Sequence, residues 1–118
     1  MNFMYKKLLT ILAASFILAG CSFTASTSRV VEVEAGSFYY KPDTITIKKG
    51  EKVRINLTAV SMMHDFNIDE LGVKVPITKS GSSSFVEFVA DKTGTFEYYC
   101  SVGSHRANGQ VGKITVEE

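Results

Sequence analysis

Alternation of apolar and polar residues dominates the sequence from residue 29 onward. The clearest case is residues 52–59, KVRINLTA, in which Val53, Ile55 and Leu57 would share one face of a strand. A period of two is typical of β-strands that bury one face. Comparable runs occupy residues 29–35, 44–48, 64–68, 84–90, 95–100 and 112–118. The pattern therefore predicts seven or so short strands.

Turn signals separate these runs. Lys-Pro-Asp at 41–43, Lys-Gly-Glu at 49–51 and the stretch 91–94 each interrupt the alternation. Turns at intervals of about 8–12 residues are typical of all-β sandwiches and barrels. No segment has a helical period over eleven residues. We therefore expect an all-β fold, a Greek-key β-sandwich or barrel of about seven to eight strands.

The N-terminus has a different pattern. Two lysines, Lys6 and Lys7, precede an apolar run over residues 8–19 that is shorter than the roughly 20 residues of a spanning helix. The run ends in Leu-Ala-Gly followed by Cys21, which resembles the lipobox of bacterial lipoproteins. That resemblance implies cleavage before Cys21 and acylation of its thiol. The alternative is an ordinary signal peptide followed by a chance cysteine.

These features divide the chain into a lipoprotein signal peptide (1–20), a small, polar tether (21–28) and one domain (29–118). We expect a bacterial protein that is exported and held through Cys21 on the outer face of the cell membrane or in the periplasm. Loss of Lys6 and Lys7 leaves eleven basic and twelve acidic side chains, a net charge of −1. Since no basic patch stands out, nucleic acid is not an expected partner. Nothing in the sequence indicates an oligomer, so we expect a monomer.

One cysteine remains for the domain. If Cys21 carries lipid, Cys100 has no partner for a disulfide within the chain. A single thiol outside the cytoplasm is open to oxidation, and ligation of a metal would both use and protect it.

The strong soft or borderline metal donors in the domain are few. They are His64, Cys100, His105, Met62 and Met63. Two imidazoles and a thiolate form a trigonal set that suits copper, and a weak axial Met or Gln completes a blue-copper site. Cys100, His105 and Gln110 follow one another at intervals of five residues, so one loop can present all three, and His64 comes from a separate strand.

The stretch CSVGSHRANGQ resembles the copper loop of the cupredoxins. FYYKPDTITIKKGEKVRINLTA, MMHDFNI and GTFEYYC extend the resemblance over residues 30–116, the whole domain. It implies one copper ion that cycles between Cu(II) and Cu(I), with His64, Cys100 and His105 as equatorial ligands. Gln110 replaces the usual axial methionine, as in the stellacyanins, and its harder oxygen should lower the reduction potential. Met62 or Met63 is the alternative axial donor.

The resemblance also implies supporting residues. In the family, the residue after the first histidine is linked to the residue after the cysteine, and here these are Asp65 and Ser101. A backbone N–H near Asp65 could also donate to the Cys100 sulfur and tune the potential. The alternative is that Asp65 is a solvated turn residue.

Other chemistries fit this residue set less well. A binuclear copper site needs a second loop cysteine, and Ser104 stands where it would lie. Structural zinc usually shows paired, closely spaced Cys or His ligands. A Cys100–His105 nucleophile pair has no sign of an orienting group or an oxyanion hole. The remaining alternative is a buried structural cysteine with two surface histidines.

The function predicted from the sequence is a membrane-anchored electron carrier, not an enzyme, that exchanges single electrons with redox partner proteins. His105 would be the ligand edge through which electrons pass, with Val102, Ala107 and Val111 as an apolar docking patch around it. A copper-binding or copper-delivery protein is the main alternative, and an enzyme with an open copper position is another.

Overall fold

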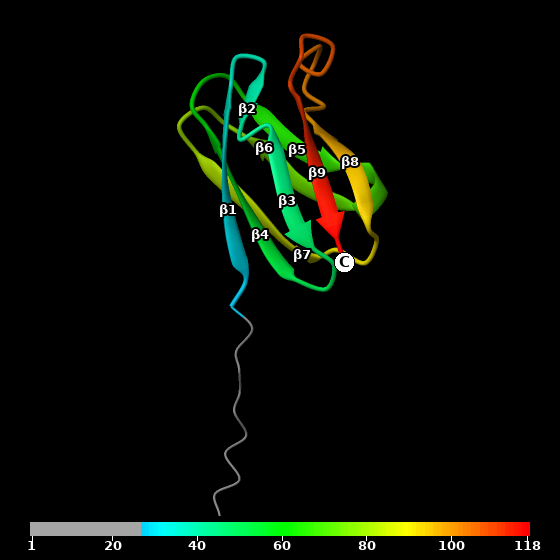
Figure 1. Ribbon diagram of the computed structural model, residues 1–118. Helices are drawn as coiled ribbons and strands as arrows, with labels where there is room; N and C mark the ends of the chain where they lie inside the picture. The colour runs from blue at the N-terminus through cyan, green and yellow to red at the C-terminus, as the bar shows by residue number, and fades with distance from the viewer. Residues whose placement is uncertain (1–26) are drawn as a thin grey trace, which may run out of the picture.

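The computed structural model describes residues 27–118, and nine strands in this range form two packed sheets (Figure 1). This confirms the expected all-β sandwich. The signal peptide 1–20, the lipidation candidate Cys21 and all of the tether but residues 27 and 28 lie outside the described residues. Within residues 27–118, no helix has the length and apolar character needed to cross a membrane.

One sheet has four strands and the other has five. The first has the order β2 (Tyr39–Lys41), β1 (Arg29–Gly36), β4 (Lys52–Ala59), β7 (Ser83–Val89). The second has the order β3 (Thr44–Lys48), β9 (Val111–Glu117), β8 (Gly94–Tyr99), β5 (His64–Ile68), β6 (Val73–Thr78). The β1–β4 and β3–β9 pairs are parallel and the other pairs are antiparallel. A short 3₁₀ turn, η1 (Asp69–Leu71), joins β5 to β6.

The inward faces of the two sheets form one apolar core. In β4, Val53, Ile55 and Leu57 are completely buried and alternate with partly exposed residues, as the sequence pattern predicts. In contrast, all five residues of β5 are buried, and β5 lies inside its sheet between β8 and β6. His64 therefore begins a strand that is fixed on both sides.

Two strands were missed by the sequence pattern, so the described residues hold nine strands rather than seven to eight. β2 is only three residues long and is followed directly by Pro42. β6 contains Pro76, which cannot donate a ladder hydrogen bond and is tolerated because β6 is at the edge of its sheet. The short length and the proline hide the alternation in these two strands.

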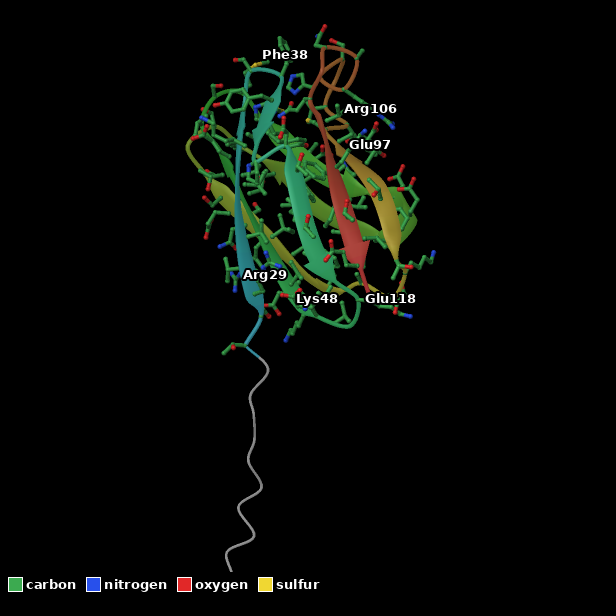
Figure 2. The ribbon with its side chains drawn as sticks, viewed as in Figure 1. Arg29, Phe38, Lys48, Glu97, Arg106 and Glu118 are labelled. Carbon is green, nitrogen blue, oxygen red and sulfur yellow. The ribbon has the colours of Figure 1, made fainter. Side chains whose placement is uncertain are left out.

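The two ends of the sandwich carry different features. The β1–β2 turn and the long β8–β9 loop lie together at the top of Figure 1, where Figure 2 labels Phe38 and Arg106. Arg29, at the start of β1, lies at the opposite end with Lys48 and the C-terminal Glu118 (Figure 2). The chain therefore enters the domain at the end remote from the β8–β9 loop.

Candidate metal centre

His64 is held from one side by the loop that precedes β5. Its side chain is completely buried, and its Nε2 lies 2.6 Å from the backbone oxygen of Ser61. A carbonyl oxygen only accepts hydrogen bonds, so Nε2 carries the hydrogen and donates it. In the neutral ring, this leaves Nδ1 with a free lone pair, which is the form that a metal ion needs.

The β8–β9 loop carries Cys100, His105 and Gln110 and is closed on itself by backbone hydrogen bonds. The backbone N–H of Cys100 donates to the backbone oxygen of Gln110 at 3.3 Å, and the backbone N–H of Gln110 donates to the backbone oxygen of His105 at 3.0 Å. A further bond runs from the His105 N–H to the Val102 oxygen at 3.0 Å. These bonds hold together the backbone that carries the three residues.

The structure brings the two histidines and the cysteine to one point. One ligand atom from each of His64, Cys100 and His105 can be chosen so that all three lie within 4.8 Å of one another. Nδ1 of His105 is 3.5 Å from the Cys100 sulfur, and Nδ1 of His64 is 4.0 Å from it. Both histidines are buried, with exposures of 0% and 7%. The alternative of two surface histidines beside a structural cysteine is therefore wrong.

Gln110 joins this cluster with its oxygen. The Gln110 side chain is completely buried, and its Nε2 donates to the backbone oxygens of Tyr39 at 3.0 Å and Gly36 at 3.5 Å. The amide is thereby oriented, and Oε1 lies 2.9 Å from Nδ1 of His64. Met62 and Met63, the alternative axial donors, are 45% and 48% exposed. The geometry favours Gln110 over either methionine as the axial donor.

The contact between His64 and Gln110 tests whether this donor set suits a cation. Nδ1 of neutral His64 and Oε1 of Gln110 are both acceptors, and their partners on the other side fix them in that role. Two lone pairs 2.9 Å apart repel one another in a buried site, where screening is weak. A positive charge shared by the two atoms makes the contact favourable. The residues present therefore fit a bound metal ion.

Asp65 links the strand of His64 to the loop of Cys100, as expected. The Ser101 N–H donates to Asp65 Oδ1 at 2.7 Å, and the Ser101 hydroxyl donates to Oδ2. Burial acts to raise the pKa of Asp65, but the hydrogen bonds from Ser101, Asn67 and Cys100 together outweigh it and lower that pKa. Asp65 is completely buried and is not a solvated turn residue.

The Cys100 thiol is tuned by its surroundings. Burial raises its pKa, while the backbone N–H groups of Asp65 and Val102 act in the opposite direction. Donors directed at the sulfur favour the thiolate, which is the form that ligates metals.

The sequence itself matches the family model of the cupredoxin-like domain over residues 8–116. The chain belongs to this family. In a cupredoxin-like domain, His64, Cys100 and His105 are positioned as a site for one copper ion.

The chain is also similar to individual proteins. The chain is 35% identical over 77 residues to the nitrous-oxide reductase of Stutzerimonas stutzeri, a match that covers 61% of this chain and 12% of that protein. The chain thus spans about an eighth of the length of that relative.

Two solved structures share the fold. Auracyanin from Roseiflexus castenholzii has a TM-score of 0.67 and 17% identity, over 78% of this chain and 99% of that one. Auracyanin A from Chloroflexus aurantiacus, described as a "blue" copper protein, has a TM-score of 0.60 and 18% identity, over 75% and 99%.

One contact of the site was not foreseen from the sequence. The ring of Phe38, in the β1–β2 turn, packs edge-on against the His105 ring, with centroids 5.4 Å apart and an interplanar angle of 78°. Phe38 and His105 are 67 positions apart, and no spacing rule connects them.

Of the three residues expected to form a docking patch, Ala107 is exposed, whereas Val102 and Val111 are partly buried.

Proposed function

We propose that this protein is an exported, lipid-anchored blue copper protein that carries single electrons between redox partner proteins. The observation that supports the proposal most directly is the buried cluster of His64, Cys100 and His105, with donor atoms within 4.8 Å of one another. Copper bound there supplies the one-electron chemistry, and the chain supplies the geometry and tuning.

In this proposal the four ligands have distinct roles. His64, Cys100 and His105 are the equatorial ligands, and Gln110 is the axial donor through Oε1. The loop is closed by backbone bonds and His64 is fixed by Ser61, so the donors keep their places when the charge on the metal changes. An amide oxygen is harder than a thioether and favours Cu(II), so the reduction potential is lower than with an axial methionine.

Electrons enter and leave through His105 in this proposal. It is the one member of the three-residue cluster with any exposure, 7%, whereas His64 and Cys100 have none. Its Nδ1 faces Cys100, so its Nε2 lies on the other side of the ring. Ala107 and the partly buried Val102, on the same loop, and the partly buried Val111, at the start of β9, supply apolar surface. A redox partner would dock there.

The first experiment is the addition of Cu(II) to the purified apo-protein. A thiolate in a trigonal copper site gives an intense visible absorption, so the protein should turn blue, lose the colour on reduction and regain it on oxidation. Cys100→Ser is the control and should bind copper without the intense band. A colourless complex of the wild-type protein would contradict the proposal.

The same sample separates electron transfer from copper delivery. A carrier should retain its copper through repeated cycles of reduction and oxidation in the presence of a competing Cu(I) chelator. A delivery protein should lose Cu(I) to the chelator within the first cycles. The four donors are almost completely buried, which favours retention.

The role of Gln110 is tested by Gln110→Met. We expect the blue colour to persist and the reduction potential to rise, because a thioether stabilises Cu(I) relative to an amide oxygen. Met63→Leu is the matched control and should leave the potential unchanged. The opposite result, with a shift in Met63→Leu alone, would assign the axial position to the methionine.

The proposed anchor is tested by Cys21→Ser. The wild-type protein should fractionate with membranes and carry an acyl mass on its N-terminal cysteine, whereas the variant should be released from the membrane. A wild-type protein that fractionates away from membranes would contradict the anchor and leave the copper site unaffected.

A further inference from the structure

The β1–β2 hairpin contributes none of the four donor side chains, yet it contacts two of them. The hairpin pairs Gly36 with Tyr39 across a two-residue turn, Ser37–Phe38. The backbone oxygens of Tyr39 and Gly36 accept hydrogen bonds from the Gln110 amide nitrogen, and the Phe38 ring packs against His105. Figure 2 shows Phe38 at the end of the sandwich where the β8–β9 loop lies.

Phe38 adopts a backbone conformation that is unfavourable for it. Its φ is +66°, in the left-handed region that suits glycine and that a bulky side chain rarely adopts. Phe38 is 37% exposed, so the rest of its surface is covered, and the aromatic ring it contacts at this site is that of His105. Strained residues are concentrated at functional sites. The contact that Phe38 gains is the edge-on one with His105.

The hairpin also determines which atom of Gln110 faces the cluster. If the amide were rotated by half a turn, Oε1 would oppose two carbonyl oxygens and Nε2 would face Nδ1 of His64. The two backbone acceptors thus exclude that orientation and present the oxygen to the metal. Position 110 is held as an oxygen donor by main-chain atoms more than 70 positions earlier.

We propose that the β1–β2 hairpin is a cap on the copper site, in which Phe38 is a positioning residue that covers His105 and excludes small ligands from solvent. The ligands excluded are water and small anions such as azide, which would otherwise add to the metal beside His105. The inference rests on the copper site of the proposed function and adds a residue that controls access to it.

The test compares Phe38→Gly with Phe38→Tyr. Glycine adopts a φ of +66° without strain, which offsets part of the packing lost with the ring, so the apo-protein with Phe38→Gly should still fold. Its Cys100 thiol should nevertheless react severalfold faster with a thiol reagent. After copper loading, azide should change the visible and paramagnetic resonance spectra of this variant. Phe38→Tyr keeps the ring and should match the wild type in all of these measurements.

A merely structural role for Phe38 predicts a different result. In that case Phe38→Gly would change thermal stability alone, with thiol reactivity and azide response as in the wild type, and the cap would be ruled out. Should Phe38→Gly fail to fold, Phe38→Asn provides a second variant, because asparagine also tolerates this conformation. A wild-type protein that never turns blue would refute the proposed function, while the thiol rates of the apo-protein would still decide the inference about the cap.

Discussion

The two histidines of the metal centre are held in contrasting ways. His64 begins a buried strand, is completely buried, and has both ring nitrogens engaged, with Ser61 on one side and Gln110 and Cys100 on the other. His105 lies in a loop, is 7% exposed, and is held by the loop backbone and the Phe38 ring. The strand histidine therefore belongs to the framework of the domain, and the loop histidine lies just beneath its surface.

The largest expected effect comes from replacing each histidine by glycine. His64→Gly leaves a buried hole and deprives the Ser61 carbonyl of its hydrogen-bond donor, so the apo-protein should lose about 2–4 kcal/mol of stability. His105→Gly opens the site to solvent and should cost less stability, while fast electron exchange with a partner is lost. Denaturant unfolding and electron-transfer kinetics measure the two losses.

Added imidazole distinguishes the two variants further. It should restore the blue spectrum of copper-loaded His105→Gly, because the vacated space adjoins the surface, and should fail to restore His64→Gly. Equal rescue of both variants would show that the difference in burial between the two histidines has no consequence for access.

Gly112→Ala tests the strand framework below the loop. A Cβ at position 112 would lie 2.2 Å from the ring of Tyr98, which is completely buried and stacks on Phe66. The ring must move to accommodate the methyl group, and overpacking of this kind costs about 1–3 kcal/mol. Urea unfolding of the apo-protein measures the change, with the exposed neighbour change Lys113→Ala as the control. An unchanged unfolding midpoint would mean that the Tyr98 ring has room to shift.

Features that depend on local sequence patterns could be predicted, whereas contacts between distant segments could not. The alternation in β4 and the spacing of Cys100 and His105 are local patterns; the first predicts the strand that is observed, and the second predicts two members of the observed cluster. β6 was missed because Pro76 interrupts its alternation. The packing of Phe38 on His105 depends on how the hairpin folds over the loop, and a local pattern contains no signal for it.

Asp65 and Ser101 connect the framework to the loop, and their link should have an intermediate effect. Asp65→Ala leaves the Ser101 N–H without its acceptor and should cost about 1–3 kcal/mol. Ser101→Ala retains that backbone bond and should cost about 1 kcal/mol. The double variant should be less destabilised than the sum of the two single variants, which a double-mutant cycle of unfolding free energies measures. Strict additivity would show that the two residues are not coupled.

The smallest effect is expected on the outer side of the loop. Arg106 lies over the Tyr99 ring, 3.9 Å from its centroid, and forms an ion pair with Glu97, with both partners about half exposed. Exposed pairs of this kind contribute about 0–1 kcal/mol. Arg106→Ala should therefore change thermal stability only slightly and leave the blue spectrum unaltered. A large spectral change would place Arg106 in the framework of the site rather than on its surface.

The direction in which β1 runs has a consequence for how a partner meets this protein. β1 starts at Arg29, and its eight residues, at about 3.3 Å each, carry the chain about 25 Å toward the end that bears Phe38 and the β8–β9 loop (Figure 1). With the proposed attachment at Cys21, the copper would be presented on the side of the domain that faces away from the lipid. We would then expect a redox partner to approach from the side of the domain opposite the point where the chain enters it.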